Sequence, residues 1–104
     1  MTRRVSQFRW DELPLDKVTE MVARKVITGA RETLAQVYLK KGALVPQHAH
    51  GADQWIYVLQ GALRAVVNGD ETTVREGDVL QVPGGVRHQA EAIDDTFVLT
   101  VTGG

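Results

Sequence analysis

Hydrophobic residues recur along this chain in short runs and not in long helical periods. From Glu32 onward, runs rich in Val, Leu, Ile, Thr and Tyr are separated by Gly, Pro, Asn and Asp, which is typical of an all-β chain. About eight strands in one domain suit a sandwich or a small closed barrel. The pattern predicts strands at Val22–Thr28, Thr33–Leu39, Trp55–Gln60, Leu63–Val67, Thr72–Arg75, Val79–Val82, His88–Ala92 and Thr96–Val101.

Two local patterns refine this prediction. The segment Trp10 to Met21 is the one stretch that could be helical, but Pro14 and a poor apolar period predict an arm with at most one turn. Asn68-Gly69 lies between two strand-like runs. Because a two-residue type I′ turn needs positive φ at both central positions, this pair predicts a hairpin between antiparallel strands.

Length and charge limit the function classes. A chain of 104 residues supports one hydrophobic core, so we expect a single domain over 1–104, with an arm at 1–21 and a barrel at 22–104. Hydrophobic residues make up 43% and charged residues 24% of the chain, as in ordinary soluble globular proteins. The 12 basic and 13 acidic residues give a net charge of -1 and form no basic stripe, so we expect neither nucleic acid nor a membrane surface as a partner.

The chain contains no cysteine. Disulfides, thiolate zinc sites and cysteine nucleophiles are therefore excluded. No stretch approaches the roughly 18 apolar residues of a membrane span, and no apolar run follows the charges near the N-terminus. We expect a cytoplasmic protein.

The three histidines are the candidate chemistry. His48 and His50 are separated by one residue just before a predicted strand, and residues i and i+2 of an extended segment project from the same face. The side-chain oxygen of Gln54 can serve as a neutral further ligand, and His88 would come from a neighbouring strand. A His-x-His pair alone occurs in many proteins without metal, so surface histidines are the alternative.

The glycines and proline around these histidines form two longer patterns. The segment GALVPQHAHGADQWIYVLQG places Gly42 and Gly61 around the ligand candidates, and GDVLQVPGGVRH runs from Gly77 through Pro83 to His88. These segments resemble the first and second motifs of the cupin family. Most cupins carry a glutamate at the position of Gln54, and the position usually held by asparagine is Ala92 here.

The resemblance implies a fold and a metal site. The implied fold is all-β, a double-stranded β-helix (jelly-roll) barrel. The implied ligands of one divalent metal ion are His48, His50, Gln54 and His88. Zinc, nickel, iron, cobalt and manganese all suit three imidazoles and one oxygen, and the sequence does not choose among them. The alternative is a site that no longer holds metal.

Two further residues near the motifs are predicted to take part, and three of their neighbours are expected to lie away from the site. Gln81 and Arg87 flank the second motif and are predicted to bind substrate near the barrel mouth, where Arg87 would meet an anionic group; a surface arginine is the alternative. Asp53 lies one residue out of register with Gln54 and is expected in solvent. Trp55 and Tyr57 lie on the opposite strand face, where they would pack or form a dimer interface.

Three functions fit this ligand set, and no catalytic residue is predicted. The opening FRWDEL and the three-histidine, one-glutamine set resemble small cupins that open the ring of unsaturated uronates, an isomerase or lyase activity. That subgroup implies an acidic residue on the last strand, where this chain has Thr100. The alternatives are an iron or nickel dioxygenase and a non-catalytic module that binds a small sugar or acid. The resemblance also implies a homodimer.

Overall fold

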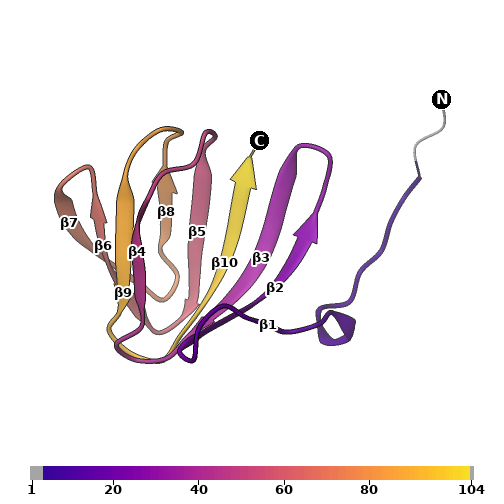
Figure 1. Ribbon diagram of the computed structural model, residues 1–104, viewed down its shortest axis with the longest axis horizontal. Helices are drawn as coiled ribbons and strands as arrows, with labels where there is room; N and C mark the ends of the chain where they lie inside the picture. Colours follow the sequence, from indigo (N-terminus) through magenta and orange to yellow (C-terminus); the bar gives the residue numbers. More distant parts are fainter. Residues whose placement is uncertain (1–3, 104) are drawn as a thin grey trace.

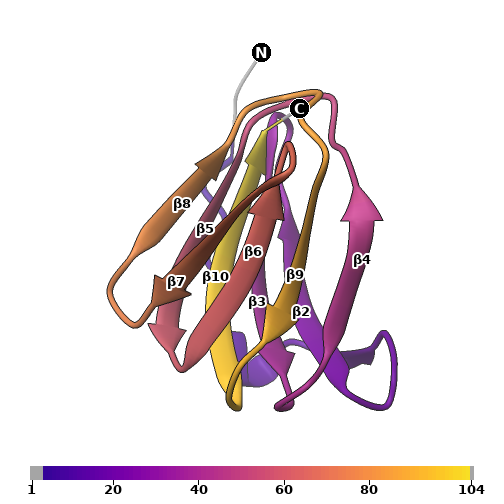
Figure 2. The ribbon, with the colours of Figure 1, turned by 90° about the vertical axis from the view of Figure 1, so that its left-hand side faces the viewer.

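The computed structural model describes residues 4–103, which form two antiparallel sheets that face each other (Figures 1 and 2). The six-stranded sheet has the order β1-β2-β3-β10-β5-β8, and the four-stranded sheet has the order β4-β9-β6-β7. One short 3-10 turn precedes them. The elements are η1 (Trp10–Glu12), β1 (Asp16–Lys17), β2 (Val22–Thr28), β3 (Glu32–Leu39), β4 (Leu44–His48), β5 (Gln54–Gln60), β6 (Ala62–Val67), β7 (Asp70–Arg75), β8 (Val79–Val82), β9 (His88–Ala92) and β10 (Thr96–Gly103).

The core lies between the two sheets and is built from side chains that alternate along each strand. In β5, Val58 is 0% exposed while its neighbour Tyr57 is 39% exposed, as expected for a strand with one face on the core. Val98 of β10 and Leu63 of β6 belong to the same buried cluster. This arrangement confirms the predicted double-stranded β-helix.

All eight predicted strands are present, and β2, β8 and β9 have the predicted bounds. Two strands were not predicted, the two-residue β1 and the five-residue β4. Pro46 lies within β4 and argues against a strand in the sequence, because proline cannot donate a hydrogen bond to a neighbouring strand. The structure accommodates it because β4 is an edge strand, with a register shift between Val45 and His48.

The Asn68-Gly69 prediction is confirmed. Asn68 has φ 49° and Gly69 has φ 86°, so both central residues adopt the positive φ of a type I′ turn. The turn joins β6 to β7, with Val67 opposite Asp70. Within residues 4–103, no helix is long and apolar enough to cross a membrane.

Candidate metal centre

The three histidines converge from two neighbouring segments. His48 ends β4 and lies directly opposite His88, which begins β9. His50 follows two residues later, in the loop that leads to β5. The His48 ring centroid lies 4.2 Å from that of His88 and 4.8 Å from that of His50. The three possible ligand nitrogens all lie within 4.8 Å of one another.

Backbone carbonyls orient two of these rings. His48 Nδ1 lies 2.8 Å from the carbonyl oxygen of Pro46, and His88 Nδ1 lies 3.0 Å from that of Val86. A carbonyl oxygen only accepts, so each Nδ1 carries a proton, and the neutral form of each ring has its lone pair on Nε2. Metal-binding histidines commonly donate their second N–H to such a carbonyl.

Gln54 reaches the same place from the other sheet. It begins β5, and its amide Nε2 donates to Thr102 Oγ1 at 3.0 Å. This hydrogen bond directs Oε1 toward His88, whose Nε2 lies 3.2 Å away. In the neutral tautomer of His88 both of these atoms are acceptors, so they do not satisfy each other.

His50 has an unsatisfied nitrogen. Its Nε2 is the one buried side-chain polar atom within residues 4–103 that has no hydrogen-bond partner. Buried polar groups in folded proteins rarely lack a partner. Desolvation by burial lowers the pKa of His50, and repulsion from His48 and His88 lowers it further. A histidine is charged when the pH is below its pKa. The lowered pKa therefore favours the neutral ring of His50, which is the form that binds metal.

These donors fit a divalent cation. Two atoms that each lie about 2.1 Å from one ion, at tetrahedral or octahedral angles, are roughly 3.0–3.4 Å apart. The 3.2 Å between Gln54 Oε1 and His88 Nε2 lies within this range. A cation between them would satisfy both acceptors and would give His50 Nε2 the partner that it lacks. Imidazole nitrogen and an amide oxygen suit zinc and the other first-row divalent ions.

The loop that carries His50 is held by the loop before β9, a contact that sequence reasoning missed. Gly85 N donates to the His50 carbonyl at 2.7 Å, and Gly84 N donates to Asp53 Oδ1 at 2.9 Å. A Cβ on Gly84 would lie 2.7 Å from the carbonyl oxygen of Gly51. The adjacent glycines of the second motif were the signal, since Gly is needed where two backbones approach closely.

Two predicted site residues lie elsewhere. Gln81 is exposed and lies opposite Trp55, so it shares the outer face of the six-stranded sheet and not the face of Gln54. Arg87 is also exposed, and its carbonyl accepts from Asn68 N at 2.9 Å. Neither residue lines the cavity described next. Their role in substrate binding stays a prediction. Asp53 is exposed as expected.

The histidines open into a cavity of about 540 Å³ between the sheets. Its wall comes from β2, β3, β4, β5, β9 and β10, with one residue each from β6 and from the β4–β5 loop and two from the turn after β1. The titratable residues among those that line it are Arg24 and the three histidines. The cavity therefore contains the candidate metal centre and no carboxylate from the described part of the chain.

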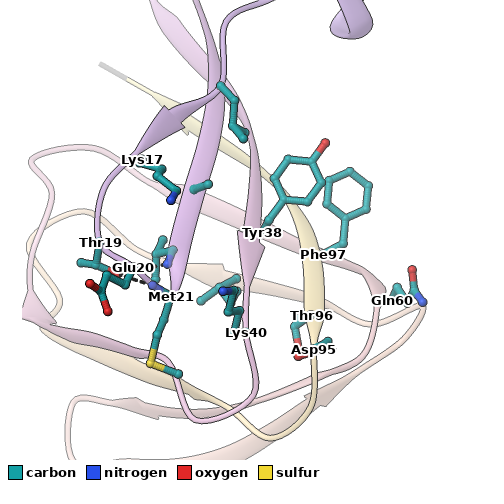
Figure 3. Close-up of a pocket in the computed structure, with 14 residues that line it drawn as sticks. Lys17, Thr19, Glu20, Met21, Tyr38, Lys40, Gln60, Asp95, Thr96 and Phe97 are labelled. Atoms are coloured by element: carbon teal, nitrogen blue, oxygen red, sulfur yellow. Dashed lines mark hydrogen bonds between the residues drawn. The ribbon is translucent and has the colours of Figure 1, made fainter.

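A second cavity, of about 410 Å³, lies near the β1–β2 turn (Figure 3). Tyr38 and Phe97 stack beside it with ring centroids 4.7 Å apart. Its charged residues are two lysines and two acids, Lys17, Lys40, Glu20 and Asp95. This cavity is separate from the histidines.

Comparison with known proteins finds relatives that share this sequence pattern and this fold. The pectin degradation protein KdgF of Dickeya dadantii is 28% identical over 94 residues, covering 88% of this chain and 86% of that protein. The structure of KdgF from a Halomonas species has a TM-score of 0.89 at 26% identity and covers 96% of this chain and 94% of that one. An RmlC-like cupin from Shewanella frigidimarina has a TM-score of 0.88 at 20% identity, covering 99% and 94%. The cupin domain model matches residues 35–102, and the chain belongs to the cupin domain family.

Proposed function

We propose that this protein binds one divalent metal ion through His48, His50, His88 and Gln54, and that the ion holds a small anionic ligand in the cavity. The observation that carries the proposal is the convergence of three imidazoles and one amide oxygen, in which the buried His50 Nε2 has no hydrogen-bond partner. Such a set costs free energy when buried without a cation.

The chain's own residues would prepare the site for the ion and the ligand. The carbonyls of Pro46 and Val86 hold two imidazoles in the tautomer that leaves Nε2 free. Thr102 holds the amide of Gln54. When bound, the ion supplies a Lewis acid that polarises a ligand oxygen. Because all four donors are neutral, its charge would not be offset by a carboxylate, which favours anionic ligands.

The relatives make a uronate one candidate ligand, since KdgF is named for pectin degradation. Ring opening of such a sugar needs a group that moves a proton. The described residues that line the cavity include no Asp or Glu, and Thr100 lies on the last strand where the resemblance implies an acid. These observations favour ligand binding over ring opening, with dioxygenase activity as the remaining alternative.

Metal content tests the proposal. We expect near-stoichiometric metal in protein purified from medium with zinc, nickel, cobalt, iron and manganese, and a strong loss in His48→Ala/His50→Ala and in His88→Ala. Arg87→Ala and Gln47→Ala are matched controls, because both residues are exposed neighbours of the predicted ligands. Elemental analysis would refute the proposal if the double histidine variant kept the wild-type metal content.

Gln54→Glu tests the role of the neutral ligand. A carboxylate attracts the ion more strongly, so metal affinity should rise, while the reduced net charge at the site should weaken anion binding. Paired titrations of both proteins, first with metal and then with a carboxylate ligand, measure the two effects. Equal or tighter carboxylate binding in the glutamate variant would show that the amide does not tune the site.

We also propose that the outer face of the six-stranded sheet pairs two copies of the chain. This face carries Trp55, Tyr57 and Tyr38, which are 45%, 39% and 38% exposed, whereas Arg64 on the outer face of the other sheet forms ion pairs with Glu71 and Glu91. An exposed apolar outer face on one sheet, when the outer face of the opposite sheet is charged, is typical of an interface.

A charge placed on this face tests the pairing. Tyr57→Lys should shift the protein from dimer to monomer in sedimentation equilibrium, because a buried unpaired lysine opposes association. Thr73→Lys is the control, since Thr73 is exposed and lies opposite Arg64 on the other sheet. A wild-type protein that is monomeric over the whole concentration range would refute the proposed dimer.

A further inference from the structure

The side chains that line the cavity form successive rows down the barrel, set by the strand register. The row at the metal end contains Thr33, Thr102 and Gln54, which lie opposite one another on β3, β10 and β5. This row and the histidines supply hydroxyl, amide and imidazole groups. A ligand at the metal would therefore find several hydrogen-bonding partners at this end of the cavity.

The rows below it are almost entirely aliphatic. The second row contains Ala35, Thr100 and Ile56, and the third row contains Val37 between Val98 and Arg24, the one charged side chain in these rows. The fourth row and the rim continue with Leu39, Val22, Leu44 and Leu63. The cavity wall thus changes from polar to apolar along the strands, at about 7 Å per row.

The polar groups that remain below the first row are few. Thr19 Oγ1 already accepts from the backbone N–H of Met21 and Val22. Arg24 lies opposite Asp16 of β1, its Nε lies 3.4 Å from Asp16 Oδ2, and its side chain is 49% exposed. Gln89 is also exposed. Thr100 is therefore the one hydroxyl in the interior rows of the described cavity that is not tied to the backbone or to the site.

We infer that the ligand is a carboxylate with one polar end at the metal and an apolar ring or chain in the barrel, and not a polyhydroxylated sugar acid. This inference rests on the proposed metal site, since the ion fixes which end is polar. A sugar ring in the aliphatic rows would lose the hydrogen bonds that its hydroxyls make with water and would gain few in return. An apolar ring of the same size would instead leave water for a matching surface.

A matched pair of probes tests the ligand class. Cyclohexanecarboxylate and quinate share the six-membered carbon ring and the carboxylate, but quinate carries several hydroxyls. We expect cyclohexanecarboxylate to bind zinc-loaded protein at least tenfold more tightly in titrations followed by calorimetry or by NMR shifts. Quinate can chelate the ion through its carboxylate and the hydroxyl next to it, which would raise its affinity. The comparison is therefore a stringent test of the expected preference for cyclohexanecarboxylate.

Two valine substitutions test whether the cavity wall produces the preference for the apolar probe. Val37→Thr puts a hydroxyl in the third row and should reduce the difference between the two probes several-fold without changing zinc affinity. Val66→Thr is the control, because Val66 lies opposite Glu71 and does not line the cavity. Unchanged zinc affinity in both variants would show that the folded site survives.

The failures of the two proposals can be distinguished. Equal or tighter binding of quinate to zinc-loaded protein overturns the ligand class and leaves the metal site standing. If no metal binds, the proposed function fails, and the same probe pair is compared in metal-free protein. There a retained preference for cyclohexanecarboxylate that Val37→Thr diminishes supports the apolar cavity, and equal binding overturns it.

Discussion

At the residue scale, the site depends on which lone pairs are left free. Three of the four donors are oriented by a second group, a carbonyl for His48 and His88 and a hydroxyl for Gln54. His50 differs, because its Nε2 has no partner and burial lowers its pKa. The Gln54 contact is the most informative, since it joins two residues 48 apart in the chain.

Thr102→Val should weaken metal binding about tenfold, the effect expected when the partner of a ligand is removed. Valine keeps the shape but cannot accept from Gln54 Nε2, so Oε1 is no longer directed toward His88. Thr100→Val is the control, because Thr100 lies on the same face of β10 next to the cavity. Calorimetric titration with nickel measures both, and identical affinities in the two variants would contradict the assigned role of Thr102.

At the element scale, strands position the histidines and loops close the site. β4 and β9 align His48 with His88, while His50 depends on the loop contact from Gly84 and Gly85 to residues 50–53. The glycine pair is therefore part of the site, although it offers no side chain.

Gly84→Ala should lower both metal affinity and the free energy of unfolding, the latter by about 1–3 kcal/mol, as for other overpacked positions. The new methyl group would meet the Gly51 carbonyl oxygen at 2.7 Å and Ala52 Cα at 3.1 Å, so the His50 loop must move. Gly51→Ala is the control in the same loop, because its Cβ would meet nothing within 4 Å. Urea unfolding and metal titration check the pair, and equal effects would exclude the steric explanation.

The sequence predicted the local parts of this structure and missed the tertiary ones. Alternation and turn residues located eight strands, and the His48-x-His50 spacing indicated a shared direction, because these patterns follow from neighbouring residues. β4 was not predicted because Pro46 argues against a strand in the sequence. Its pairing with β9 makes this segment a strand, and that pairing is a tertiary contact. The Thr102 contact and the outward position of Gln81 depend on the register between strands, which a single sequence does not contain.

At the scale of the whole molecule, the metal site joins the two sheets. His48 and His88 belong to the four-stranded sheet and Gln54 to the six-stranded sheet. An ion that binds all of them would add a link across the cavity, where aliphatic side chains leave about 540 Å³ unfilled. Metal should therefore stabilise the fold and not only the loop.

Removal of metal should lower the melting temperature. At a free ion concentration of 100 times Kd, binding adds about 2.7 kcal/mol, which corresponds to roughly 10–20 °C for a domain of this size. Thermal unfolding with zinc or with a chelator measures the shift. His88→Ala, compared with and without zinc, should show little change, and an equal rise in this variant would mean that zinc stabilises the protein elsewhere.

The division of the ligands between the two sheets also affects how the chain folds. Gln54 and His88 are 34 residues apart, and contacts between distant segments form late because the intervening chain must first lose its conformational freedom. The ion then has no complete set of donors in a collapsed chain whose sheets have not yet docked. In refolding experiments, a metal-sensitive signal would follow collapse and would report the arrival of the native topology.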